Sequence, residues 1–481
     1  MIASIFGLGV EGKKAIKSLL NNGYDVYGID LSMDIDLNYF KEIIKNSHRN
    51  NNGENHKKNQ TTEIRIQKSE KRISLKSDNL KIDLGQFNEE SVKKSNLIVL
   101  SPGLFKLKKF QKYLDYPNYF SNALNKHKSI FTIAITGTNG KTTTISMLKD
   151  ILKASGKKVL TGGNGGGGFN GYIDLVLESL KDDYEFILVE VCDMTIDFAN
   201  NLFDFDLVGL TNIGNDHLNV HGSIENYENT VINAFKDKKI FLNKDDPFTL
   251  KYTTKVNEYF KNGNINEYGD IDLKDISSKD VDSKGTNSKY IDSKINYCNL
   301  YPYDLNMIGK FNKYNAGFAY SIAKELKIDE DIIINVLNNF SGVEGRLNEF
   351  KIKNKEITIG KTDNSHAVKA ILNEKKFDVI AIGTPRDNET FRLDILDEII
   401  LNYNYNRKYQ NLIIFNGLSD NFDLVKERLN DLNFIGKLII AEKNETLINF
   451  IKTLKGNQKI FIGGNGQENI IKIQKLLKNE I

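Results

Sequence analysis

One short stretch of the sequence, AITGTNGKTTT at residues 134–144, contains the residue types that bind phosphate groups. Gly137 and Gly140 let backbone N–H groups close around phosphate oxygens, and the start of the helix expected after them adds partial positive charge. Lys141 can reach the β- and γ-phosphates of a nucleotide, and the Thr142 hydroxyl can bind Mg²⁺. The stretch is a variant P-loop, because isoleucine stands where the strict pattern has its first glycine.

Two further side chains at the ends of expected strands could assist this loop. Glu190 ends the apolar run FILVE, where a carboxylate is costly unless it is paired or bound to a metal, so it is a second candidate ligand for Mg²⁺. His217 follows the strand expected at 207–214. Ligands bind at the carboxyl ends of strands in open α/β folds, which favours a metal or nucleotide role for His217 over a structural one.

A second glycine-rich turn lies near the start of the chain. GLGVEG at residues 7–12 has the spacing of the dinucleotide-binding fingerprint, between an apolar run at 2–6 and a helix expected at 13–22. The strand expected at 25–29 leads to Asp30, the acidic residue that would bind a ribose in that fingerprint. Taken alone, this pattern indicates hydride chemistry with NAD.

Composition limits the classes of protein to which the chain can belong. The 66 Lys and Arg residues nearly balance the 63 Asp and Glu residues, which argues against a dominant nucleic-acid surface. Two cysteines, Cys192 and Cys298, form neither a disulfide framework nor a metal knuckle and fit a reducing cytoplasm. No apolar stretch approaches the roughly 20 residues that span a membrane, and the N-terminus lacks the pattern of a signal peptide.

Strands and helical patterns alternate along nearly the whole chain, which predicts an α/β fold with mostly parallel sheets. Three domains are expected: a Rossmann-like domain at 1–128, a central P-loop domain at 129–343 and a Rossmann-like C-terminal domain at 344–481. The strands of the last domain are expected to be buried on both faces, because they are uncharged apolar runs. These strands are expected at 378–384, 411–417, 437–442 and 459–464.

Two polar segments are expected to lie outside the packed core. Residues 48–63 are rich in Asn and Lys and should form a mobile loop. Residues 262–294 carry Ser-Lys every five residues, a period that matches neither helix nor strand, and are interpreted as a surface loop without an assigned function.

Several motifs in order resemble those of the Mur ligases, the ATP-dependent amide-forming enzymes of cell-wall precursor synthesis. GTNGKTTT resembles their ATP loop, the segment around His217 resembles the one with a magnesium-binding histidine, and Glu190 matches a strand-end glutamate. LNKDDP resembles the family's LNxDDP, and Asn312 and Asn315 match two asparagines near the nucleotide. GVEGRLNEF resembles the interdomain hinge, whose arginine, here Arg346, reaches ATP.

The resemblance implies a set of binding residues. ATP would bind to Gly137, Thr138, Asn139, Gly140, Lys141, Thr142, Thr143, Asn312, Asn315 and Arg346. Mg²⁺ would be held by Thr142, Glu190 and His217, and catalysis would involve Lys141, His217 and Arg346. The first domain would bind a UDP-linked acceptor in place of NAD. Its contacts would be Gly7, Leu8, Gly9, Val10, Glu11, Gly12, Asp30 and the SPG turn of Ser101, Pro102 and Gly103.

The chain departs from the family pattern at two places. Aligning Asn364 with the family asparagine puts Asp363 where many members have histidine. The position of the family's carbamylated lysine falls on Val231, so the use of a second metal is left open. Arg386 and Arg392 could bind a carboxylate of the amine substrate, although a solvated charged loop is the alternative.

The favoured interpretation is a cytoplasmic, monomeric ligase that adds a free amino acid to a UDP-linked peptide precursor through an acyl phosphate. A divergent archaeal enzyme of pseudomurein synthesis fits best, and the abundance of Lys, Ile and Asn suggests an AT-rich genome. A Mur-like ligase of coenzyme F430 maturation and a bacterial muramyl peptide ligase are alternatives. An NAD-binding module joined to a P-loop ATPase switch is the alternative from another class.

Overall fold

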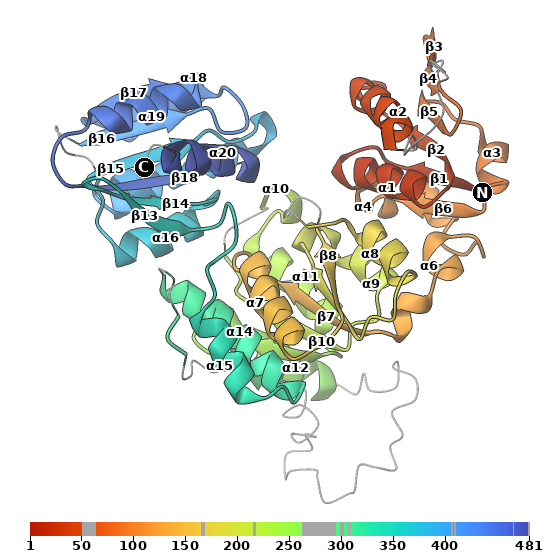
Figure 1. Cartoon of the computed structure of the whole chain (residues 1–481), viewed down its shortest axis with the longest axis horizontal. Coiled ribbons are helices and arrows are strands. Elements are labelled where there is room, and N and C mark those ends of the chain that lie inside the picture. The colour runs from red at the N-terminus through yellow and green to blue at the C-terminus, as the bar shows by residue number, and fades with distance from the viewer. Residues whose placement is uncertain are drawn as a thin grey trace, which may run out of the picture. The chain divides into compact units, whose positions relative to one another are not determined.

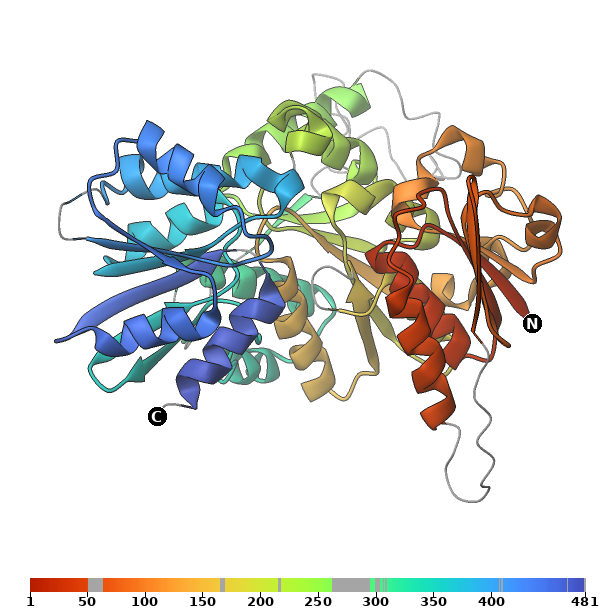
Figure 2. The same ribbon diagram turned by 90° about the horizontal axis from the view of Figure 1, so that it is seen from above.

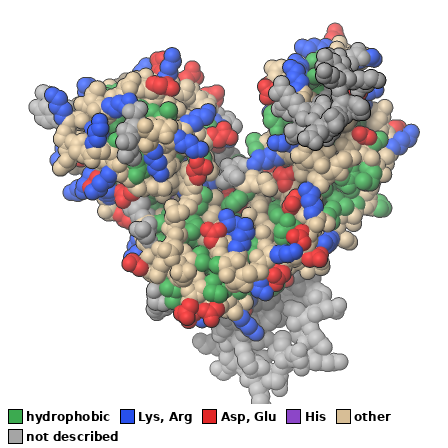
Figure 3. Space-filling view, viewed as in Figure 1, with side chains coloured by type: hydrophobic (Ala, Val, Ile, Leu, Met, Phe, Trp, Pro, Cys, Tyr) green, Lys and Arg blue, Asp and Glu red, His purple; other side chains and the backbone are tan. Residues whose placement is uncertain are grey.

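The computed structural model describes most of the chain. The described residues are 1–50, 64–164, 169–214, 218–261, 295–298, 303–305, 307, 309–405, 407, 410–464 and 466–479. Within them lie three sheets of six strands each, with helices between the strands (Figure 1). The predicted α/β class with mostly parallel sheets is confirmed. Lys and Arg side chains are interspersed with Asp and Glu on the face seen in Figure 3, as the near-zero net charge indicates.

The first sheet has the strand order β3-β4-β5-β2-β1-β6. Its strands are β1 (Ile2–Phe6), β2 (Asp25–Asp30), β3 (Arg65–Ser69), β4 (Arg72–Lys76), β5 (Leu80–Gly85) and β6 (Leu97–Leu100). Strands β5, β2, β1 and β6 are parallel, whereas β3 and β4 form an antiparallel extension. The helices here are α1 (Val10–Asn21), α2 (Asn38–Asn50), α3 (Glu89–Lys93), α4 (Pro102–Phe105), α5 (Lys108–Gln111) and α6 (Phe120–Ala123).

Two expectations for this region need correction. Helix α1 begins at Val10 and not at residue 13, because the helix starts inside the glycine-rich turn with Gly9 as its N-cap. The segment expected to be a loop from residue 48 is helical as far as Asn50, where α2 ends, and the remainder at 51–63 lies outside the described residues. Strands β3 and β4 were not predicted, because the polar pattern of β3 leaves all five of its residues exposed.

The middle sheet carries the P-loop and has the order β12-β11-β10-β7-β9-β8. Its strands are β7 (Phe131–Thr136), β8 (Val159–Gly163), β9 (Phe186–Glu190), β10 (Leu207–Leu210), β11 (Lys239–Leu242) and β12 (Ile295–Tyr297). The main helices of this part are α7 (Lys141–Ala154), α8 (Tyr172–Ser179), α9 (Ile196–Leu202), α10 (Leu218–His221), α11 (Ile224–Phe235), α12 (Pro247–Lys261), α14 (Lys310–Glu325) and α15 (Glu330–Asn338). The Ser-Lys repeat at 262–294 lies outside the described residues.

The third sheet has the order β13-β14-β18-β15-β16-β17. Its strands are β13 (Asn348–Ile352), β14 (Lys355–Ile359), β15 (Val379–Gly383), β16 (Asn411–Phe415), β17 (Lys437–Ala441) and β18 (Gln458–Gly464). All neighbours are parallel except β13 and β14. Helices α16 (Ser365–Glu374), α17 (Asp394–Asp397), α18 (Phe422–Asp431), α19 (Asn444–Thr453) and α20 (Gln467–Lys478) lie on its two sides (Figure 2).

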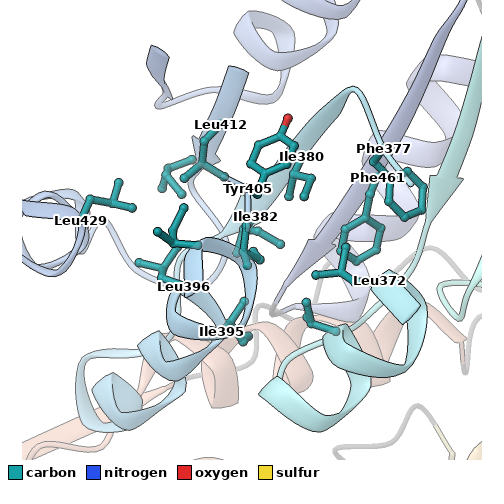
Figure 4. Packing of buried hydrophobic residues seen from close by; sticks show 14 of the residues in the cluster. Leu372, Phe377, Ile380, Ile382, Ile395, Leu396, Tyr405, Leu412, Leu429 and Phe461 are labelled. Atoms are coloured by element: carbon teal, nitrogen blue, oxygen red, sulfur yellow. The ribbon is translucent and has the colours of Figure 1, made fainter. Parts of the chain in front are cut away.

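The central strands of the third sheet are buried on both faces, as their apolar runs predict. Ile380 and Ile382 of β15 point into one hydrophobic cluster together with Leu412 and Phe461 (Figure 4). The alternate residues of the same strands enter a second cluster on the opposite face. Side chains alternate across a strand, so an uninterrupted apolar run is what a doubly covered strand requires.

The chain divides into two compact units: residues 1–134 with 157–207, and residues 135–156 with 208–481. Strand β7 is shared between these two units. Each predicted domain range contains one of the three sheets, and the domain boundaries at 128 and 343 remain predictions. No helix in the described part of the chain is long and apolar enough to span a membrane.

A buried carboxylate holds the antiparallel extension to the parallel part of the first sheet. Asp83 on β5 is fully buried and accepts hydrogen bonds from the Arg72 guanidinium at 2.8 Å, from Ser74 Oγ at 2.7 Å and from the Tyr27 hydroxyl. Lys81 Nζ lies 3.2 Å from the same carboxylate. Burial alone would raise the pKa of Asp83, but the hydrogen bonds from Tyr27, Ser74 and Arg72 outweigh it and hold the pKa below its ordinary value.

Asp83→Asn is therefore expected to destabilise the first unit by about 2–3 kcal/mol at pH 7, because it removes the charge that pairs with Arg72. The folded-state pKa is depressed, so this stabilisation is present above the unfolded pKa of about 3.9 and is lost as the pH falls through the folded pKa. The difference between the two proteins in urea unfolding should thus shrink between pH 7 and pH 3.

Asp78→Asn, at an exposed position in the turn between β4 and β5, is the matched control and should change stability by less than about 0.5 kcal/mol. A destabilisation of Asp83→Asn that is the same at both pH values would contradict the assigned role of the charge.

Candidate functional site

The P-loop between β7 and α7 requires glycine at two positions. Gly137 has φ +119°, and a Cβ there would lie 2.4 Å from Thr211 Oγ1. Gly140 has φ +90°, and a Cβ there would lie 2.2 Å from Asn315 Oδ1. Both the left-handed backbone and the close neighbours exclude larger residues, so the loop brings its backbone N–H groups to the start of α7 without obstruction. This geometry fits a phosphate group.

Side chains at the end of β10 fix the conformation of this loop. Asn212 Oδ1 accepts a hydrogen bond from Asn139 N at 3.1 Å, and Asn212 Nδ2 donates to Asn139 O at 3.0 Å. Thr211 Oγ1 donates to the same carbonyl at 2.6 Å. Lys141 Nζ donates to the carbonyls of Gly137 and Thr138, at 2.5 and 2.9 Å. The lysine ammonium thus lies directly over the loop that would hold phosphate.

Helix α14 brings two of the predicted nucleotide-binding residues to the P-loop. Asn312 and Asn315 are 2% and 5% exposed, and Asn315 Nδ2 donates to Asn312 Oδ1 at 3.1 Å. Helices α7 and α14 lie side by side (Figure 1), which places Asn315 against Gly140. The spacing of three residues puts both asparagines on one helix face.

The predicted hinge places Arg346 at the same loop. Gly342 and Gly345 have φ values of +91° and +76°, so the chain turns sharply on both sides of Val343. Arg346 Nη2 donates to Thr142 Oγ1 at 2.7 Å, across 204 residues of sequence. Arg346 therefore contacts the threonine that is the candidate magnesium ligand.

These elements border a cleft of about 470 Å³ in the second unit. It is lined by the P-loop, by the segment around Asp245 and Asp246, by the start of α14 and by one side of α16. Tyr314 Oη donates to Asp245 Oδ2 at 2.6 Å. Burial raises the pKa of Asp246 to about 6. The LNKDDP motif contains these two aspartates and marked them in the sequence. No motif marked Tyr314 as a residue of the site.

Two residues at the start of α16 also reach the P-loop. Asn364, the N-cap of α16, and Asn139 exchange two side-chain hydrogen bonds of 3.1 and 3.3 Å. His366 Nδ1 lies 3.1 Å from Asn139 Nδ2. Asn364 was a candidate from its alignment with the family asparagine, whereas His366 was not predicted, and its contact partner lies 227 residues earlier in the sequence.

The three candidate metal ligands fall in different parts of the chain. Thr142 lies in the second unit, Glu190 lies in the first, and His217 lies outside the described residues. Glu190 is 2% exposed at the end of β9, and its carbonyl accepts a hydrogen bond from Asn164 N. Among the side chains that the structure describes, no group of three or more His, Cys, Asp or Glu residues could hold a metal ion. The magnesium site stays a prediction.

In the first unit, the two segments predicted to bind the acceptor lie against each other. Gly7 has φ +89°, and a Cβ on it would lie 1.9 Å from Ser101 Oγ. A Cβ on Gly12 would lie 1.8 Å from the carbonyl oxygen of Gly7. GLGVEG thus meets the SPG turn at the carboxyl ends of β1 and β6, with the tight packing that the fingerprint glycines serve.

Asp30 supports this turn directly. Its Oδ2 accepts a hydrogen bond from Leu8 N at 2.7 Å, and its Oδ1 accepts one from Ser32 N at 2.9 Å. Both carboxylate oxygens are therefore engaged with backbone N–H groups of the first unit. The role of Asp30 in the described structure is to hold the glycine-rich loop.

Arg392 does not lie in a solvated loop, which was the alternative to a role in binding a carboxylate. Its side chain is 5% exposed and lies 3.5 Å from Asp363 Oδ2 and 3.4 Å from Glu389 Oε2. Burial alone would raise the pKa of Asp363, but Lys361 and Arg392 outweigh it and hold that pKa well below its ordinary value. Arg386, with 57% of its side chain exposed, lies 3.7 Å from Glu389.

The glycines of the first unit give a direct test of the packing. Gly12→Ala is expected to destabilise the protein by about 1–3 kcal/mol, because the new Cβ collides with a backbone carbonyl that cannot move aside. Gly9→Ala is the matched control, since nothing lies within 4 Å of a Cβ at that position. Its cost should stay below about 1 kcal/mol, the loss expected at an N-cap. Equal effects of the two changes in thermal unfolding would refute the described loop.

Comparison with known proteins agrees with this arrangement. Residues 135–323 match the family model of the Mur ligase middle domain. A UDP-N-acetylmuramoylalanine–D-glutamate ligase from Thermoanaerobacter sp. is 32% identical over 293 residues, which are 57% of this chain and 59% of that relative. The match therefore covers less than two thirds of that relative's length.

Two solved structures share the fold. A pseudomurein peptide ligase type C from Methanothermus fervidus gives a TM-score of 0.54 at 21% identity and covers 99% of both chains. The UDP-N-acetylmuramate-alanine ligase MurC from Thermotoga maritima gives a TM-score of 0.52 at 15% identity, covering 100% of this chain and 98% of the other. Residues 135–323 are therefore similar to the Mur ligase middle domain, and the chain has the fold of these ligases. The resemblance inferred from its motifs is confirmed.

Proposed function

We propose that this chain is an ATP-dependent ligase that joins a carboxylate of a UDP-linked acceptor to the amine of an amino acid. The observation that carries this proposal is the cleft at the P-loop. There Arg346 of the hinge contacts Thr142, and Asn364 and His366 from beyond the hinge contact Asn139. A ligase must position three substrates at one phosphoryl group, so convergence of two parts of the chain on the loop is what this reaction requires.

The proposed reaction has two steps. A carboxylate oxygen of the acceptor attacks the γ-phosphorus of ATP, and the bond to the bridging oxygen breaks to release ADP and an acyl phosphate. The amine nitrogen of the amino acid then attacks the acyl carbon. The carbon–oxygen bond breaks, phosphate leaves, and the amine loses a proton to give the amide.

The residues of the cleft would supply charge and orientation for these steps. Lys141 and Arg346 are the cations at the loop, and they would neutralise the negative charge of the phosphate chain. Asn312 and Asn315 would lie along the nucleotide, while Asn139 would hold the loop shape. Mg²⁺, which the Thr142 hydroxyl is suited to hold, would neutralise further phosphate charge when bound.

The first domain is proposed to bind the nucleotide-linked end of the acceptor. The turn at GLGVEG precedes α1, a helix of 12 residues, and the SPG turn lies beside it. Both oxygens of Asp30 accept backbone N–H groups, which favours a structural role over binding of an NAD ribose. A diphosphate at this helix start therefore fits better than a complete NAD molecule.

A pseudomurein peptide precursor is the proposed acceptor, in keeping with the favoured interpretation of the sequence. The likeness to the Methanothermus fervidus ligase supports the fold of such an enzyme. Muramyl peptides and a tetrapyrrole carboxylate, as in coenzyme F430 maturation, are the other acceptors that the sequence analysis left open. Each differs in the carboxylate it presents, so a substrate panel separates them.

The experiment measures phosphate release from ATP with each acceptor and each amino acid, separately and together. Release should be low without both substrates and should rise at least tenfold with the correct pair. Lys141→Ala should reduce that rate about 100-fold or more, because a charge at the phosphates is lost. Lys153→Ala, an exposed position on the same helix, should leave the rate unchanged.

Rapid ATP hydrolysis that needs neither acceptor nor amine would overturn the proposed ligase and would favour an ATPase switch. Release that is stimulated by muramyl peptides or by the tetrapyrrole alone would retain the ligase reaction and reject the pseudomurein acceptor.

A further inference from the structure

The last turn of α16 supplies a cap that α14 lacks. Helix α14 begins after Gly309, which has no side chain to accept a hydrogen bond from the first turn, and that turn contains no acidic residue. The backbone N–H of Lys310 donates instead to Glu374 Oε1, 64 residues later in the sequence. Glu374 is the last residue of α16. A carboxylate from beyond the hinge thus satisfies an N–H that has no partner within its own helix.

The position of Glu374 is unfavourable for the helix to which it belongs. A negative charge in the last turn of a helix lies at the negative end of the helix dipole, where a lysine or arginine would be stabilising. Helix α16 has no basic residue in its last turn. The same charge beside the first turn of α14, a helix of 16 residues, lies at a positive end. The contact with α14 therefore explains Glu374 better than any role within α16.

Phe311, the next residue of α14, makes a second contact across the hinge. Its side chain is partly buried and packs against the hydrophobic cluster of the third sheet that includes Leu347, Ile371 and Leu372. A Cβ on Gly309 would lie 2.4 Å from Phe311 Cε1, so the ring lies over the glycine and needs the space that it leaves. An aromatic ring from α14 is thereby part of the packing beyond the hinge.

Helix α16 is attached at both ends and forms one wall of the cleft. Its N-cap, Asn364, exchanges side-chain hydrogen bonds with Asn139 of the P-loop, and its last residue meets the start of α14. Its 10 residues span about 15 Å. Ala367, Ala370 and Ile371 lie between these two ends and line the cleft. The wall therefore moves away from the cleft only when contacts at one end or both are broken.

We propose that Phe311 and Glu374 are positioning residues that hold the end of α16 against α14 before a nucleotide binds. Together with the Lys310 N–H they form a latch, which must release for a nucleotide to enter or leave the cleft. The latch joins protein to protein and is the same with or without nucleotide, so it sets the rates of entry and exit and leaves the affinity nearly unchanged. This inference deepens the proposed function and rests on it, because a nucleotide must occupy the cleft.

The first test measures the latch without nucleotide, by pulsed electron spin resonance on the full-length protein. Spin labels are placed at the exposed positions Lys153→Cys on α7 and Lys426→Cys on α18, and the two natural cysteines are buried. The distance between the labels should have one narrow distribution. Phe311→Ala should add a second, broader population, and the surface change Glu374→Ala should add a smaller one. Phe311→Leu, which keeps an apolar side chain, should retain most of the narrow population.

The second test measures association and dissociation of ADP that carries a fluorescent group on its ribose, by stopped flow. Glu374→Ala should raise both rate constants about two- to tenfold, the effect of losing a charged hydrogen bond at an exposed helix start, and should keep the Kd within about threefold. Glu374→Gln retains an oxygen acceptor without the charge and should have a smaller effect. Glu427→Ala, which removes an exposed carboxylate on α18, is the matched control and should change neither rate.

The results separate failure of this inference from failure of the proposed function. A label distance that is already broad in the original protein, or that neither Phe311→Ala nor Glu374→Ala changes, overturns the latch. Faster dissociation of ADP from Glu374→Ala at an unchanged association rate also overturns it, because that result indicates contact with the nucleotide itself. If the original protein binds no ADP, the proposed function fails, and the label distances still decide whether Phe311 and Glu374 hold α16 in place.

Discussion

Close approach of one backbone to another at the carboxyl ends of parallel strands is the constraint on which both candidate sites depend. Gly12 packs against the carbonyl of Gly7, and Gly137 packs against the backbone of Asn212. In the third sheet, Gly464 meets the backbone of Gly383 in the same way. At each of these contacts a Cβ would lie within 3 Å of a backbone atom, so no side chain larger than hydrogen fits.

This constraint explains why the sites are formed mainly from loops that a rigid sheet supports. The strands end at nearly the same level, and the turns after them must pass close to their neighbours before a helix begins. Backbone N–H groups are thereby gathered at helix starts, where negative groups are stabilised. The P-loop adds to this the side-chain amides of Asn212 after β10, of Asn315 on α14 and of Asn364 at the N-cap of α16.

Much of the fold follows from the sequence because its strands are short, uninterrupted apolar runs between charged segments. β15, β16 and β18 are of this kind, and both of their faces are covered. The antiparallel pairs β3–β4 and β13–β14 were not predicted, for the opposite reason. β3 is entirely exposed, and only the last of the five residues of β13, Ile352, is buried, so burial leaves little signal in their composition. The start of α1 was misplaced because its N-cap is itself one of the fingerprint glycines.

The candidate site was predictable to the extent that its residues lie in local motifs. Asn315 and Arg346 stand in recognisable patterns, and the structure places both against the P-loop. His366 does not, because its environment is created by Asn139, 227 residues earlier, and by Gly214. Contacts between residues this far apart in the sequence are set by the tertiary fold, and no local pattern contains them.

The exposed strand β3 has a consequence for how this chain meets other copies of itself. A strand at the edge of a sheet presents free backbone donors and acceptors to any other extended chain. β3 is only five residues long and includes Arg65 and Lys68, so a second copy aligned along it would bring like charges together. The extension therefore protects the interior strands of the first sheet and discourages edge-to-edge aggregation through its charge.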